Sequence, residues 1–169
     1  MLQSHSNALA MSRRVLRVLI TLNLLLGFLI LALLIASLIA WEWVIGALGA
    51  PPTSSIEARL VMVIGVLGTP VTHVALTRLL AIVRSVSVGD PFVAENATRL
   101  RQIAWAVLGL ELLHMGVGIV EAKAASGAAP LDLDWSFSLT PWLAVLLLFV
   151  LAEVFAHGTR MREELEGTI

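Results

Sequence analysis

The sequence contains no cysteine, and only 14% of its 169 residues are charged. Without cysteine the chain can form neither a disulfide nor a thiolate metal site, and it has no cysteine nucleophile. An average soluble domain has about a quarter of its residues charged and about half of them apolar. Here 59% are hydrophobic and the mean hydropathy is +0.94, which indicates a protein that lies in a lipid bilayer.

Four apolar runs are long enough to cross a membrane as helices, since about 20 apolar residues span a hydrocarbon core of about 30 Å. The first run has no charged residue, whereas each of the other three contains ionisable side chains. The runs cover residues 18–40, 60–83, 103–120 and 139–156. The sequence therefore predicts an all-α, polytopic membrane protein: one integral membrane domain over residues 1–169, with four transmembrane helices in an up-down bundle.

Most of the basic residues lie on one predicted side of the membrane. Only Arg59 and Lys123 fall on the other side. The remaining nine are Arg13, Arg14, Arg17, Arg78, Arg84, Arg99, Arg101, Arg160 and Arg162. Loops rich in arginine and lysine remain in the cytoplasm. We therefore expect both termini, a loop over residues 84–102 and a tail over residues 157–169 to be cytoplasmic.

Three polar side chains are expected at one level inside the membrane. At 1.5 Å per helical residue, Asn23 lies about 9 Å from Arg17 and Arg78 about 9 Å from Arg84. By the same measure Glu153 lies about 10 Å from Arg160. Charges in the hydrocarbon region are costly, so such groups usually face inward and pair. We therefore predict that Arg78 is the counter-ion of Glu153, with Asn23 as a third member.

A second polar set is expected near the middle of the bilayer. Helix counting places His73 about 16 Å from Arg84, and Glu111 and His114 about 15 and 20 Å from Arg101. Glu111 and His114 are three residues apart, a spacing that metal-binding helices use, but the sequence has only one such pair. Hydrogen bonding between helices is therefore favoured over a metal or proton-relay site. Glycines in the same spans, among them Gly65 and Gly109, predict close helix contacts.

Enzymatic chemistry has no recognisable motif in this chain. There is no phosphate-binding glycine loop, no nucleophile elbow and no HExxH pair. No predicted extramembrane segment exceeds about 25 residues, which is well below the size of a self-sufficient soluble domain. We expect a protein that is not an enzyme, holds no cofactor and binds no nucleic acid directly.

Two stretches, residues 89–105 (GDPFVAENATRLRQIAW) and 151–169 (LAEVFAHGTRMREELEGTI), carry a resemblance to a known family. Over nearly its whole length the chain resembles the bacterial four-helix membrane proteins catalogued as domain of unknown function 2975. The loop element of that family, G-x-P-F followed by asparagine and leucine-arginine, is matched by Gly89, Pro91, Phe92, Asn96, Leu100 and Arg101. Its A-E-x-F-x-x-G element and its chain end are matched by Ala152, Glu153, Phe155, Gly158, Thr168 and Ile169.

The resemblance implies a context rather than a chemistry, because the family's activity is unassigned. Its members resemble one another in often being encoded beside a small cytosolic helix-turn-helix regulator. The resemblance thus implies a regulatory or sensing protein of the bacterial cytoplasmic (inner) membrane whose cytoplasmic face engages such a transcription factor. The residues expected at that face are Asp90, Pro91, Phe92, Asn96, Arg101, Gly158, Thr168 and Ile169.

One alternative remains open at this point. The protein could be a small permease or an ion- or metal-binding membrane protein that uses His73, Glu111 and His114. Homo-oligomerisation in the bilayer is compatible with either function.

Overall fold

The computed structural model describes residues 2–48, 55–89, 93–125 and 138–166, which form five helices. They are α1 (Leu2–Ile39), α2 (Trp41–Leu48), α3 (Ser55–Val88), α4 (Ala94–Ala125) and α5 (Leu139–Glu166). All but the short α2 are long and apolar enough to cross a membrane. The four predicted spans and the all-helical class are therefore confirmed for this part of the chain, while α2 was not predicted.

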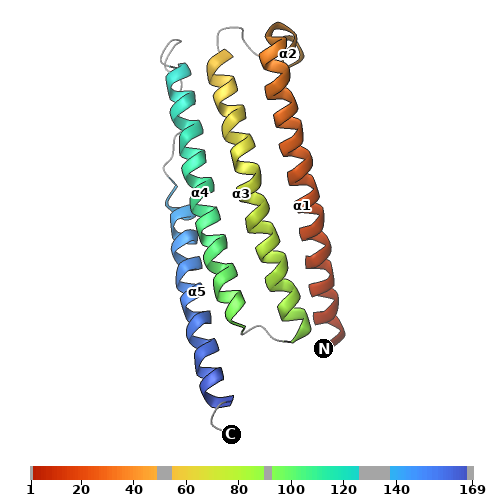
Figure 1. Ribbon diagram of the computed structural model, residues 1–169, viewed down its shortest axis with the longest axis vertical. Coiled ribbons are helices and arrows are strands. Elements are labelled where there is room, and N and C mark those ends of the chain that lie inside the picture. Colours follow the sequence, from red (N-terminus) through yellow and green to blue (C-terminus); the bar gives the residue numbers. More distant parts are fainter. Residues whose placement is uncertain (1, 49–54, 90–92, 126–137, 167–169) are drawn as a thin grey trace.

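The long helices alternate in direction and form an open row (Figure 1). Helix α1 packs on α3, α3 on α4 and α4 on α5, and no other pair of described long helices packs to a comparable extent. A closed bundle would also pack α1 against α5. The predicted up-down order is present, and the described helices form an open row in which α5 packs on α4 alone.

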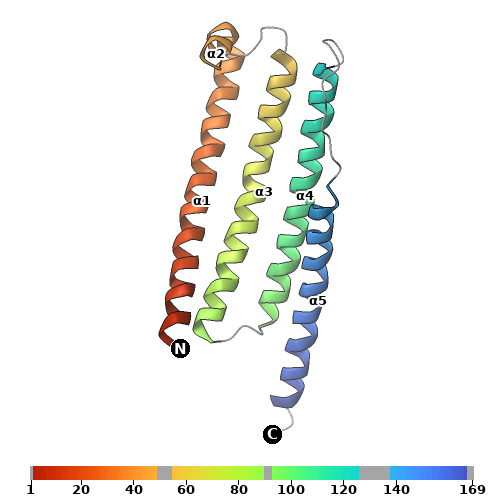
Figure 2. The same ribbon diagram turned by 180° about the vertical axis from the view of Figure 1, so that it is seen from behind.

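Helix α5 is displaced along the row relative to its neighbours. In both ribbon views it begins beside the middle of α4 and ends beyond the other helices (Figures 1 and 2). At that same end α1 begins, α3 ends and α4 begins, and we call it the termini end. The displacement brings the charged last turns of α5 past the end of α3 and the start of α4.

Helices α1 and α3 approach each other closely at Gly27. A Cβ atom placed on Gly27 would lie 2.9 Å from the Cβ of Thr69 and closer still to its methyl group. One turn earlier on α1, Asn23 Nδ2 donates a hydrogen bond to the carbonyl of Thr69 at 3.1 Å. Inside a membrane, small residues and interhelical hydrogen bonds of this kind are the main source of helix association. Gly27 therefore sets the distance at which Asn23 can reach α3.

The predicted glycine contacts are present on α3 and α4. Gly65 faces Ile30 of α1, and a Cβ there would lie 3.4 Å from the Ile30 side chain. Gly109 and Gly116 of α4 face Val71 and Ile64 of α3 at 3.7 and 3.5 Å by the same measure. These spacings correspond to ordinary van der Waals contact, so an alanine would also fit at these three positions, unlike at Gly27.

Arg59 joins the end of α1 to the start of α3, at the end of the row away from the termini end. Its Nη2 donates a 2.7 Å hydrogen bond to the carbonyl of Ser37, and its guanidinium lies 5.2 Å from the ring centre of Trp41. The last carbonyls of a helix lack partners within that helix, and α1 ends at Ile39. Arg59 thus caps α1 and stacks on the first residue of α2, a role that the sequence did not reveal.

We expect Gly27→Ala to lower the stability of the protein in detergent by about 1–3 kcal/mol, because the added methyl group forces α1 and α3 apart. Gly46→Ala is the matched control, since a Cβ there meets nothing within 4 Å and alanine favours the helix. Thermal unfolding of both variants measures the difference. Equal stability of the two would contradict the close approach at Gly27.

Candidate functional site

Glu153 forms an ion pair with Arg101, which lies on the neighbouring helix. Arg101 Nη2 lies 3.3 Å from Glu153 Oε2, and each side chain is more than half exposed. His157, one turn further along α5, places its Nδ1 3.9 Å from Glu153 Oε1 and adds to the pair when it is protonated. Both members of the ion pair belong to the stretches that resemble the family. The pair therefore joins the loop element on α4 to the last-span element on α5.

The predicted pairing of Arg78 with Glu153 is wrong. Arg78 lies on α3, and α4 stands between α3 and α5. Asn23 does not join Glu153 either, because its amide bonds to the backbone of Thr69. Helix counting placed these groups at similar depths, but depth alone does not determine which helices are neighbours.

Asn96 is fully buried where α4 begins. Its Nδ2 donates to Ser85 Oγ of α3 at 2.7 Å, and its Oδ1 accepts a 2.7 Å hydrogen bond from Arg99. Buried polar groups are costly unless they are hydrogen-bonded, and Asn96 meets this requirement on both of its side-chain atoms. It was predicted to bind a partner, but its burial gives it the structural role of holding the start of α4 against the end of α3.

Gly89 ends α3 as the sequence predicts. Its φ angle is +93°, a backbone conformation that only glycine adopts at low cost, and its N–H donates to the carbonyl of Val86 at 3.1 Å. The other predicted partner residues are placed less completely. Asp90, Pro91, Phe92, Thr168 and Ile169 lie outside the described residues, whereas Gly158 lies within α5 and is partly exposed.

The residues near the bilayer middle form no cluster of metal ligands in the described part of the chain. No group of three or more histidine, aspartate or glutamate side chains that could hold a metal ion occurs among the described residues. His73 is half-buried, and its Nδ1 has no hydrogen-bond partner within this part of the chain. Glu111 is partly exposed and His114 is exposed on α4.

Farther from the termini end than the ion pair, small and aromatic residues hold α4 against α5. Ala104 of α4 and Ala152 of α5 are both fully buried. The rings of Trp105 and Phe149 meet edge to face, with 5.3 Å between their centres and 82° between their planes. Aromatic pairs favour this arrangement. The contact between α4 and α5 therefore has an apolar part within the membrane and a charged part at the termini end.

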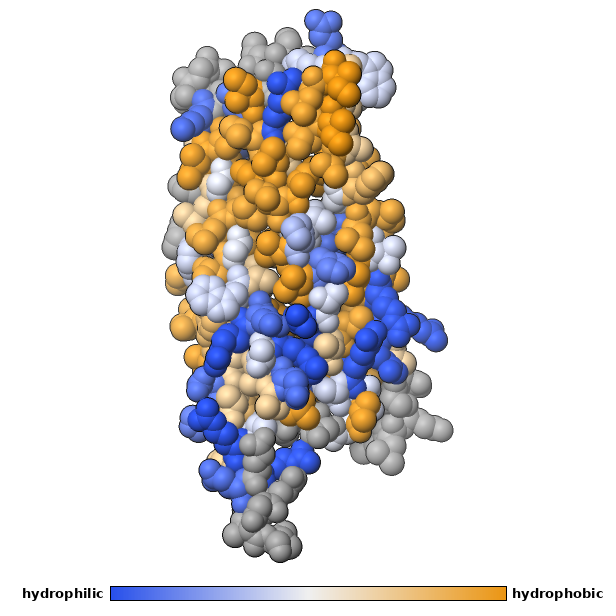
Figure 3. Space-filling model, in the orientation of Figure 1, coloured by the Kyte–Doolittle hydropathy of each residue, from blue (hydrophilic) through white to orange (hydrophobic). Residues whose placement is uncertain are grey.

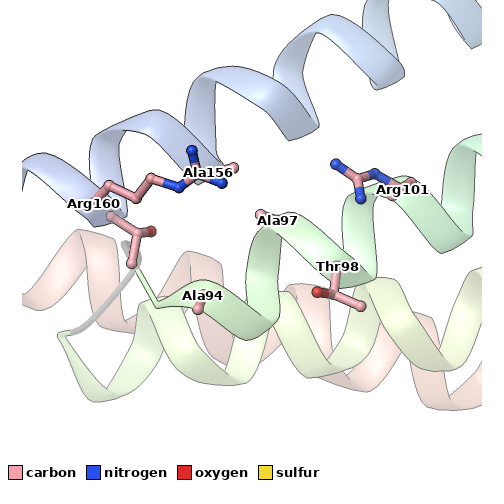
Figure 4. A pocket seen from close by; sticks show the side chains of 7 residues that line it. Ala94, Ala97, Thr98, Arg101, Ala156 and Arg160 are labelled. Atoms are coloured by element: carbon pink, nitrogen blue, oxygen red, sulfur yellow. The ribbon is translucent and has the colours of Figure 1, made fainter.

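Two pockets flank the first turns of α4. The first, of about 270 Å³, lies between α4 and α5 and is shown in Figure 4. Its lining consists of Ala94, Ala97, Thr98, Arg101, Ala156, Thr159 and Arg160. The second, of about 380 Å³, lies between α3 and α4 and is lined by Arg78, Ala94, Glu95, Thr98, Arg99 and Gln102. In the space-filling view, hydrophilic side chains gather toward the termini end, whereas the opposite half is mostly hydrophobic (Figure 3).

A family model, described as protein of unknown function DUF2975, matches residues 7–169 of the chain. The chain belongs to the DUF2975 family. This confirms the resemblance drawn from the two sequence stretches. No curated protein and no solved structure matches the chain.

In this DUF2975 protein, several residues of the candidate site had no signal in the sequence. Arg160 and Thr98 line the pocket between α4 and α5, and three alanines provide its space. Alanine is common in apolar helices, so its pattern does not indicate a pocket. Arg101, by contrast, is predicted from the sequence, because it belongs to the loop element of the family.

A double-mutant cycle tests which arginine pairs with Glu153. Arg101→Gln and Glu153→Gln should be non-additive in their effect on unfolding free energy, by the roughly 0.2–1 kcal/mol typical of exposed ion pairs. Arg78→Gln and Glu153→Gln should be additive, because these residues lie on helices that are not neighbours. Thermal unfolding in detergent measures all four free energies of each cycle. Coupling in the second cycle and additivity in the first would contradict the observed pairing.

Proposed function

We propose that this DUF2975 protein is a non-enzymatic regulatory or sensing protein of the bacterial cytoplasmic membrane. Its termini end faces the cytoplasm and binds a small helix-turn-helix transcription factor. The observation that supports this most directly is the displacement of α5, whose last turns extend beyond the other helices (Figures 1 and 2). A projecting helix end is accessible to a cytosolic protein.

The distribution of charge supports a cytoplasmic termini end. Nine of the eleven arginine and lysine residues lie on α1, α3, α4 and α5 toward this end. Arg59, at the opposite end, is used within the protein because it caps α1. An excess of basic residues on one side is the usual mark of the cytoplasmic face.

The last turns of α5 have the chemistry of a docking helix. Met161 is 59% exposed and is flanked by the exposed arginines Arg160 and Arg162. Methionine is flexible and polarisable, and it is common at surfaces that bind a partner helix. The resemblance described in the sequence analysis implies a neighbouring helix-turn-helix regulator as the partner. An apolar side chain among charges thus offers a contact for a small helical protein.

Capture from native membranes tests this function. We expect mild cross-linking, affinity purification and mass spectrometry to recover a small helix-turn-helix protein with the tagged chain. Met161→Glu should reduce its recovery severalfold, because a carboxylate replaces the exposed apolar side chain. Met11→Glu is the matched control, since Met11 is similarly exposed and lies near the start of α1 at the same end.

Recovery of the tagged chain alone, at good yield, would contradict the proposal. Equal loss of the partner in both methionine variants would also contradict it, because the effect would then arise from added charge anywhere on the termini end.

A further inference from the structure

Two arginines converge on the pocket between α4 and α5. In Figure 4 the side chains of Arg101, from α4, and Arg160, from α5, extend toward each other across the pocket. Two guanidinium groups repel each other unless a negative charge lies between them. Their convergence is therefore a feature to be explained.

The described carboxylates at the pocket balance only part of this charge. Glu153 pairs with Arg101 at 3.3 Å. Arg160 makes no ion pair with any described residue, and it is exposed. Among the residues that line the pocket or form an ion pair with its lining, the two arginines and Glu153 leave one positive charge. A ligand with a single negative charge would restore the balance.

The pocket also offers a suitable set of hydrogen-bond donors. The guanidinium of Arg160 presents a planar fork that matches the oxygens of a phosphate group. Thr98 also lines the pocket, but in Figure 4 its side chain points away from α5 and from the two arginines. The hydroxyl of Thr159 is already used, because it donates to the carbonyl of Phe155 at 2.9 Å. Arg160 and Arg101 are thus the donors that a ligand between the two helices would meet.

The position of the pocket along the helices fits the level of the lipid headgroups. The apolar stretch of α5 that could cross a membrane ends at Arg162, two residues beyond Arg160. Earlier along α5 than Arg160, Val150 and Val154 are exposed, as expected of a surface that contacts acyl chains. A phospholipid beside α5 would therefore present its phosphate near Arg160.

We propose that the α4–α5 pocket binds one phosphate group, held by Arg160 and Arg101. A phosphodiester carries a single negative charge and so balances the excess at the pocket. The group can be supplied by the headgroup of an anionic phospholipid or by a soluble phosphate. The proposal concerns a small ligand and does not depend on the binding of a transcription factor.

Ligand titration of the full chain in a non-ionic detergent tests the proposal. The probes are phosphatidylglycerol, phosphatidylcholine and inorganic phosphate, and the readouts are the midpoint of thermal unfolding and the dissociation constant. We expect phosphatidylglycerol to raise the midpoint more than phosphatidylcholine does. Arg160→Gln should weaken its binding about tenfold, because a charge-assisted hydrogen bond is lost.

Two further variants keep the result interpretable. Thr98→Val is nearly isosteric and removes only a hydroxyl that points away from the two arginines, so it should leave the dissociation constant unchanged. Arg84→Gln is the matched control, since Arg84 is exposed at the end of α3 and lines neither pocket. It should leave the dissociation constant unchanged.

The three probes distinguish the sources of the phosphate group. Selective stabilisation by phosphatidylglycerol that depends on Arg160 assigns the pocket to a lipid headgroup. Stabilisation by inorganic phosphate with the same dependence assigns it to a soluble phosphate. If neither probe binds, or if Arg84→Gln weakens binding as much as Arg160→Gln does, the proposal is overturned.

Discussion

The lack of a hydrophobic force between helices in lipid is the constraint on which this structure depends. Apolar side chains gain little by leaving acyl chains for one another, so the helices associate through close packing and a few polar bonds. Helix α3 shows both means: Thr69 lies against Gly27 of α1 and accepts a hydrogen bond from Asn23, while Gly68 lies beside Leu110 of α4. Each later contact extends the row by one helix, and the contact between α4 and α5 brings the two family elements together through Arg101 and Glu153.

Sequence reasoning predicted the helices well but not their arrangement. The four spans follow from length and apolarity, which need no knowledge of neighbours. The open row could not be predicted, because a membrane helix is apolar on most of its faces and its pattern does not indicate which face meets a partner. Leu25 and Leu29 of α1, for example, are both exposed, and they resemble residues of any contact surface. The break at Ala40 also lacked a glycine or proline signal.

The candidate site shows a similar division. The family elements pointed to Arg101, Glu153 and Asn96, and all three have defined partners in the structure. The pairing itself was mispredicted, because counting residues gives depth along a helix but not the order of helices across the membrane. The burial of Asn96 was equally hidden, since an asparagine in the first turn of a helix is usually exposed. The pocket beside Arg160 arises from alanines on two helices, and only the docking of α5 on α4 reveals it.

The most direct test of this account is thiol cross-linking in native membranes. Because the sequence has no natural cysteine, only the introduced thiols of the chain can react with the reagent. One doubly substituted chain carries Trp105→Cys and Phe149→Cys, whose rings meet between α4 and α5. The other carries Leu22→Cys and Leu147→Cys, which lie on the two outer helices at similar levels by the contacts between successive helices and are both exposed. A short bifunctional thiol reagent should link the first pair within a single chain and leave the second pair unlinked. A link within one chain between α1 and α5, without one between α4 and α5, would show a closed bundle in which the family elements do not meet as described.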